Sequence, residues 1–119
     1  MNIRIKTSDY KMPAKVADYL DEKIAGLEKL LGDGAETARC EVELGRASGK
    51  KHSDHQWFAE IQMKRPGEKA LVARNNESSI NAAIDNARNE MRAQLLKMKT
   101  VKKDKVRKDA GKAKRLLQS

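Results

Sequence analysis

The residues with the clearest chemistry in this sequence are cations spaced along one predicted helix. At about 100° per residue, one polar flank of a helix that begins near residue 80 contains six residues: Asn81, Asp85, Arg88, Arg92, Lys99 and Lys103. A rigid helix can hold such cations at fixed spacing against nucleic-acid phosphates, whereas a solvated charged face without a partner is the alternative. Further candidate phosphate contacts are Lys97, on another part of the polar side, and Lys102, which extends the run.

A second group of basic residues lies in a predicted loop. Lys50 and Lys51 follow Arg46 within a polar, glycine-containing stretch between two predicted strands. A loop at the end of a sheet can reach a second phosphate, but lysines are equally at home in a loop that contacts only water. The sequence leaves both interpretations open for this loop.

The positive charge of the chain is concentrated at one end. Residues 1–87 contain 14 Lys and Arg against 14 Asp and Glu, whereas residues 88–119 contain 12 against 3, which accounts for the whole net charge of +9. Such a segment gains affinity for phosphate backbones by releasing condensed counterions. Membrane binding needs an apolar face beside the charge, and the few large apolar residues after Met98 make a poor one. Nucleic acid is therefore the favoured partner, and no membrane is expected.

Catalytic and metal-binding patterns are weak. His52, Asp54 and His55 lie close together and Cys40 could approach them, yet their spacing matches no motif of a metal or acid–base site. The sequence has no glycine-rich phosphate loop and no nucleophile–base pattern. We therefore expect a protein that is not an enzyme, with no metal, no cofactor and no small-molecule substrate. Trp57 is expected to pack in the core rather than to stack on bases.

The elements that must position these residues follow from hydrophobic periodicity. Strands are predicted where apolar and polar residues alternate, at residues 1–7, 38–44, 57–64 and 70–74. Helical spacing predicts one helix over residues 13–31 and a second that starts after Ser78 or Ser79, either of which can cap it. The apolar stripe of the second helix ends at Met98.

The order of these elements predicts an α+β fold of the type β-α-β-β-β-α. A four-stranded, mostly antiparallel sheet would carry both helices on one face, because each element has only one apolar side. We expect one domain over residues 1–103 and a basic, flexible tail over residues 104–119. The single cysteine and the lack of an apolar leader predict a cytoplasmic protein.

Several segments together resemble one known family. They are Asn2–Ile5, Tyr19–Ile24 with Leu27–Leu30, Ala82–Asp85, and Gln94–Leu95 followed by Lys97. In this order and spacing they resemble the ribosome hibernation promoting factors, also known as ribosome-associated translation inhibitors or sigma-54 modulation proteins. The resemblance spans most of the predicted domain and indicates a short form without the second, dimer-forming domain of long members.

The resemblance implies a fold related to the double-stranded-RNA-binding domain and a steric role in translation. It implies binding to 16S rRNA in the decoding region of the small ribosomal subunit, where messenger and transfer RNA would otherwise lie. By position, Lys23, Lys29 and Lys97 match basic residues of the family and are implied rRNA contacts. The implied partners are the small subunit and the 70S ribosome, in stress or stationary phase, with a monomer off the ribosome.

Two other functions remain open. The same fold and charge would suit a general double-stranded-RNA-binding protein or an RNA chaperone, since recognition of duplex shape tolerates many sequences. Excess duplex RNA should displace such a protein from ribosomes, but not a site-specific one. A regulator of transcription that acts through protein contacts is the third hypothesis, and its complexes should survive nuclease.

Overall fold

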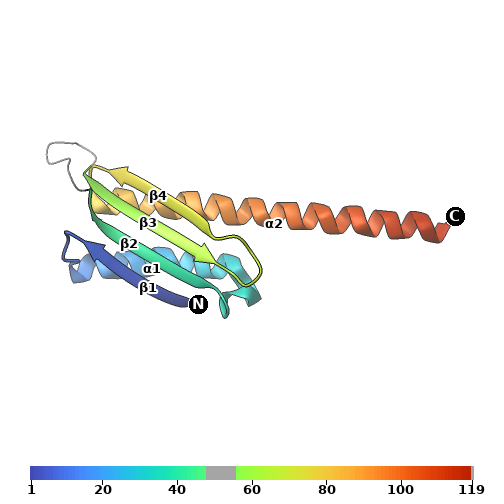
Figure 1. Cartoon of the computed structure of the whole chain (residues 1–119), viewed down its shortest axis with the longest axis horizontal. Helices are drawn as coiled ribbons and strands as arrows, with labels where there is room; N and C mark the ends of the chain where they lie inside the picture. Colours follow the sequence, from blue (N-terminus) through green and yellow to red (C-terminus); the bar gives the residue numbers. More distant parts are fainter. Residues whose placement is uncertain (48–55, 119) are drawn as a thin grey trace.

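The computed structural model has the predicted element order β-α-β-β-β-α (Figure 1). It describes residues 1–47 and 56–118, with side chains described up to residue 99. The strands are β1 (Asn2–Ser8), β2 (Arg39–Arg46), β3 (Trp57–Lys64) and β4 (Leu71–Glu77). The helices are α1 (Ala14–Leu31), the short 3-10 helix η1 (Gly32–Ala35) and α2 (Ile80–Gln118). The predicted α+β class is confirmed.

The strands form one mixed sheet in the spatial order β1-β2-β3-β4. β2, β3 and β4 are an antiparallel meander, whereas β1 runs parallel to β2, with Ile3 opposite Cys40 and Ile5 opposite Val42. The parallel pair is possible because α1 carries the chain back from the end of β1 to the start of β2. The sheet is therefore mostly antiparallel, as the sequence predicted.

The core lies between one face of the sheet and the two helices, which both cover that face (Figure 1). The largest side chains buried there come from both layers: Leu20, Leu27, Val42, Leu44, Ile61, Met63, Ile84 and Met91. Among the described residues, no polar or charged side chain is buried. Because alternate strand residues point to opposite faces, the second face of the sheet is open to solvent. Polar side chains that bind a partner must therefore lie on the helices, the loops or this open face.

Two apolar expectations differ from the structure at the margins of the sheet. Ile3 and Ile5 share one face of β1, as predicted, but they are 43% and 42% exposed because they lie outside the core cluster that the helices close. Trp57 keeps its predicted register at the start of β3, yet it also lies outside this cluster and packs against Tyr10. The expectation that Trp57 is a core residue is therefore wrong.

The two long helices begin differently. Ser79 caps α2, since its hydroxyl oxygen accepts a hydrogen bond of 3.2 Å from the backbone N–H of Ala82. Pro13 precedes α1 without a side-chain cap, because proline carries no polar side-chain atom. α1 ends at Leu31 and is followed by Gly32, whose φ of 57° lies in the region that glycine adopts without strain.

α2 extends far beyond the sheet (Figure 1). Leu95 is the last buried residue among its described side chains, whereas the helical backbone continues to Gln118. The molecule is consequently elongated, with principal extents of 68 × 27 × 20 Å. The predicted division into a domain of residues 1–103 and a tail of residues 104–119 is not tested by the length of this helix and stays a prediction.

Candidate nucleic-acid interface

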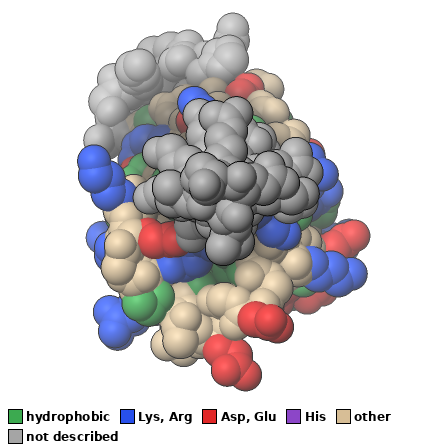
Figure 2. Space-filling view, turned by 90° about the vertical axis from the view of Figure 1, so that its right-hand side faces the viewer, with side chains coloured by type: hydrophobic (Ala, Val, Ile, Leu, Met, Phe, Trp, Pro, Cys, Tyr) green, Lys and Arg blue, Asp and Glu red, His purple; other side chains and the backbone are tan. Residues whose placement is uncertain are grey.

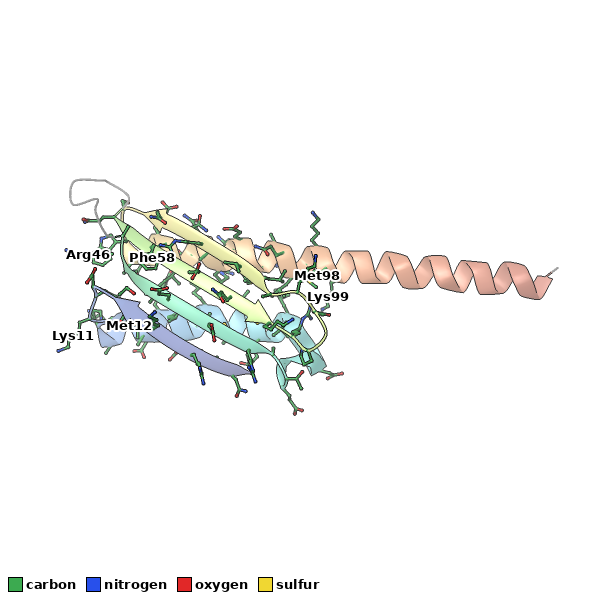
Figure 3. The ribbon with its side chains drawn as sticks, in the orientation of Figure 1. Lys11, Met12, Arg46, Phe58, Met98 and Lys99 are labelled. Carbon is green, nitrogen blue, oxygen red and sulfur yellow. The ribbon has the colours of Figure 1, made fainter. Side chains whose placement is uncertain are left out.

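Three of the predicted cations lie on the flank of α2 that faces α1. Arg88 is half-buried there, whereas Arg92, one turn later, and Lys99, two turns after Arg92, are exposed. Two contacts with α1 fix this orientation: Asp85, one turn before Arg88, pairs with an α1 lysine, and Lys99 borders a small hollow with Leu30. Figure 3 shows Lys99 where α2 leaves the sheet. We call Arg88, Arg92 and Lys99 the basic flank.

A polar cluster joins the two helices next to the basic flank. Tyr19 of α1 donates a hydrogen bond from its hydroxyl group to the carboxylate of Asp85 on α2. The Nζ atom of Lys23 lies 3.6 Å from the same carboxylate and 5.0 Å from the centre of the Tyr19 ring. Lys23, an implied rRNA contact, is therefore already paired with a carboxylate in the free protein.

Arg88 differs from Lys23 in having no acceptor in the described part of the chain. Its Nε–H is buried and lacks a hydrogen-bond partner among the described residues, and the side chain as a whole is half-buried. A partly desolvated guanidinium without a counterion favours an anion at its exposed end, because burial strengthens charge-assisted hydrogen bonds. Arg88 is therefore the residue of the basic flank with a buried donor that has no hydrogen-bond partner among the described residues.

The other described candidates lie away from the basic flank. Lys97 is on the side of α2 that faces β4, where Gln94 donates a hydrogen bond of 2.9 Å to the Val72 carbonyl and Glu90 accepts one of 2.8 Å from Asn75. Lys29 is exposed in the last turn of α1, where a cation also interacts favourably with the helix dipole. The structure therefore does not bring Lys97 or Lys29 together with Arg88.

Four further candidates cannot be placed as side chains. Lys50 and Lys51 lie outside the described residues. Lys102 and Lys103 belong to the helical backbone of α2, beyond the part of the chain whose side chains are described. Their contacts with rRNA stay predictions.

The surface around the departing α2 has mixed charge. In the end-on view of Figure 2, Lys and Arg side chains alternate with Asp and Glu side chains around the grey atoms. Net charge alone therefore does not define a binding face on the described residues. What distinguishes the basic flank is that none of its three residues forms an ion pair with a described residue.

Sequence reasoning missed the cross-helix contacts of Tyr19 and Asp85. These residues are 66 positions apart, and their contact depends on how α1 and α2 lie side by side. Asp85 was recognised as part of the polar flank, but its pairing with Lys23 was not. The available signal was the helical spacing of Tyr19 and Lys23, which puts both on the side of α1 next to its apolar stripe.

Replacing Tyr19 by phenylalanine is expected to lower the free energy of unfolding by about 1 kcal/mol at neutral pH, because one hydrogen bond to a carboxylate is lost. That hydrogen bond is the main cause that raises the pKa of Tyr19, with desolvation second. A raised folded pKa stabilises the fold below the unfolded pKa, and this contribution disappears as pH rises through the folded pKa. Urea unfolding at neutral and strongly alkaline pH measures both effects. If the Tyr19→Phe variant loses as much stability between neutral and alkaline pH as the wild type does, this role of Tyr19 is contradicted.

Other chemistries find no support in the described residues. No group of His, Cys, Asp and Glu in that part of the chain is arranged to hold a metal ion, while His52, Asp54 and His55 lie outside it. Burial raises the pKa of the Cys40 thiol to about 11, so the nucleophilic thiolate is scarce at neutral pH. None of the helices, over the described residues, is both long and apolar enough to span a bilayer.

The fold and the basic flank define a small α+β protein whose long second helix presents cations that form no ion pair with the described residues. More specifically, the chain belongs to the sigma 54 modulation protein / S30EA ribosomal protein family, whose model matches residues 3–103. The family predicted from the sequence is thereby confirmed.

Solved structures agree with this assignment. The chain is similar to the N-terminal domain of Protein Y from Thermus thermophilus, with 28% sequence identity and a TM-score of 0.66 over 82% of this chain and 99% of that one. It also has the fold of a ribosomal subunit interface protein from Coxiella burnetii, with 12% identity and a TM-score of 0.64 over 84% and 99%. The sequence has no match among curated proteins.

Proposed function

We propose that this protein binds the small ribosomal subunit and the 70S ribosome through 16S rRNA and lowers translation by steric exclusion. The basic flank would lie against rRNA phosphates in the decoding region, so that the body of the domain occupies space needed by messenger and transfer RNA. The protein would act as a cytoplasmic hibernation factor in stress or stationary phase and would be a monomer off the ribosome.

Family membership over residues 3–103 carries this proposal. The family description names a ribosomal protein, and one structural neighbour is described as a ribosomal subunit interface protein. The basic flank supplies the physical means, because three cations without ion-pair partners among the described residues lie on one side of the same helix. Releasing counterions from rRNA phosphates would then drive association.

The proposed action requires no bond to be made or broken. Binding energy alone would exclude the competing RNAs, so neither a nucleophile nor a metal nor a cofactor is needed. Rigid placement matters instead: α2 is fixed on the sheet by Ile84, Ala87 and Met91, which are completely buried. The basic flank therefore keeps its spacing when it meets the phosphates.

Co-sedimentation with 70S ribosomes and separated subunits at physiological salt, together with translation in vitro, tests the proposal. We expect saturable binding near one copy per small subunit and a parallel fall in translation. Weak, unsaturable binding to both subunits with unchanged translation would contradict it.

A general duplex-RNA binder remains the second candidate, because the 12 to 3 excess of cations after residue 87 favours any phosphate backbone. Adding excess duplex RNA to the ribosome complex separates the two functions. A site-specific ribosome factor stays bound, whereas a general binder is displaced.

A further inference from the structure

Another cation is held at the end of the sheet opposite to the extension of α2. Arg46 is the last residue of β2 and is opposite Trp57, the first residue of β3. The Cζ atom of the Arg46 guanidinium lies 4.7 Å from the centre of the Trp57 ring. Tyr10, which follows β1, packs edge-on against the same indole, with 5.2 Å between ring centres and an angle of 76° between the rings. Three chain segments therefore meet here.

The Arg46 guanidinium lies over an aromatic ring, and the residue is nevertheless exposed. Arg46 is an exposed residue, and it forms no ion pair with any described residue. The guanidinium is planar, so one face can rest on the indole while its edges and outer face reach solvent. Figure 3 shows Arg46 at this end of the sheet, with Lys11 at the same end. Lys11 is exposed as well and adds a second positive charge.

A second arginine that lies over an aromatic ring differs from Arg46 in having a counterion. Arg74 lies 4.2 Å from the centre of the Phe58 ring, on the open face of the sheet. Its guanidinium, however, is 3.9 Å from the carboxylate of Glu60 on the neighbouring strand. Arg74 therefore has a counterion within the protein, whereas Arg46 has none among the described residues.

The chemistry of this group fits an unpaired nucleotide. A base can stack on the outer face of a guanidinium plane, and guanidinium edges donate hydrogen bonds to phosphate oxygens. A base inside a duplex has both faces covered by its neighbours, so only single-stranded RNA offers a free one. The surrounding side chains add apolar ring surface and positive charge, which together match a flat ring linked to an anion.

We propose that Arg46, Trp57 and Tyr10 form a stacking site for one unpaired nucleotide of RNA, separate from the basic flank of α2. This inference rests on the proposed function in taking RNA as the partner. The site would let the protein hold a single-stranded residue at one end of the sheet while the basic flank of α2 contacts phosphates. Arg46 would supply the stacking plane, and the two aromatic rings would fix its orientation.

The single tryptophan of the chain reports on this site directly, because all tryptophan fluorescence comes from Trp57. Titration with a short oligoadenylate is expected to change this fluorescence saturably. The same strand paired with its complement is expected to change it little. Arg46→Lys keeps the charge and removes the planar stacking surface, so we expect about tenfold weaker oligoadenylate binding, as stacking on one base predicts. Arg74→Lys is the matched control and is expected to bind like the wild type.

Thermal unfolding tests whether both variants fold. We expect that they do, because each substitution keeps the charge of the side chain. Equal oligoadenylate affinity in Arg46→Lys and wild type, or equal signals from single strand and duplex, would overturn the stacking site. Ribosome co-sedimentation of the wild type keeps the two proposals apart. If the wild type binds ribosomes and the oligoadenylate signal is absent, only the stacking site is wrong. If the Arg46-dependent signal is present without ribosome binding, only the proposed function is wrong.

Discussion

Replacing Arg88, Arg92 and Lys99 together by glutamate is expected to weaken binding to the 70S ribosome by at least about a hundredfold at physiological salt. Each reversal removes a cation from the basic flank and places a carboxylate near an rRNA phosphate. The plot of log affinity against log salt concentration has a negative slope, and each lost phosphate contact makes this slope less steep by about one unit. Co-sedimentation at several salt concentrations measures both the affinity and the slope.

Two further variants show whether position or net charge causes this loss. Arg88 is half-buried, so replacing it by glutamate also lowers the stability of the fold. The double variant Arg92→Glu/Lys99→Glu changes exposed residues only, and its affinity for the ribosome is expected to fall about tenfold. A control with the same change in net charge as the triple variant reverses three exposed cations of the sheet and its β3–β4 turn: Arg39, Lys64 and Lys69. An equal loss of affinity in the control would mean that the basic flank is not the interface.

Replacing Gly45 by alanine is expected to lower the free energy of unfolding by about 3 kcal/mol, a large part of the stability of a small domain. A Cβ atom at this position would collide with the carbonyl oxygen of Ser8 and would lie 3.0 Å from its carbonyl carbon. Because the obstacle is backbone rather than a flexible side chain, the end of β1 must move. The hydrogen bond of 2.6 Å from the Ser8 hydroxyl to Glu43 would be disturbed as well.

Gly26 supplies the matched glycine control. It lies within α1, where an added Cβ would meet no atom within 4 Å. Alanine there is expected to raise the free energy of unfolding by about 1 kcal/mol, since glycine is the poorer helix former. Urea unfolding of both variants gives the two values. Unchanged stability of Gly45→Ala would show that β1 adapts without cost and would contradict the steric argument.

Hydrophobic periodicity was sufficient to predict the order of the elements and the face that each one buries. In β2, for example, Cys40, Val42 and Leu44 alternate with charged residues and are all buried against the helices. The rule works because a residue's face is set by its position within its own element. For the same reason, the common flank of Arg88 and Arg92 followed from the sequence.

Contacts between elements could not be predicted in this way. The carboxylate of Asp85 neutralises Lys23 only because α1 and α2 lie side by side, and Arg46 stacks on Trp57 only because of the register between β2 and β3. The sequence also placed Gly45 in a loop, whereas the structure has it in β2, beneath the end of β1. Each of these features depends on residues that are distant in the chain.

The parallel position of β1 has a consequence for the order of folding. Each residue of β1 pairs with a residue of β2 that lies beyond the whole of α1. Because closing this long connection costs conformational entropy, we expect the β1–β2 pairing to form after α1 has folded. Since β1 is also poorly buried, its amides should exchange with solvent through local opening at lower free energy than those of β3. Each opening turns β2 into an edge strand with unpaired backbone groups. β1 therefore adds little to the core but protects β2 from pairing with another chain.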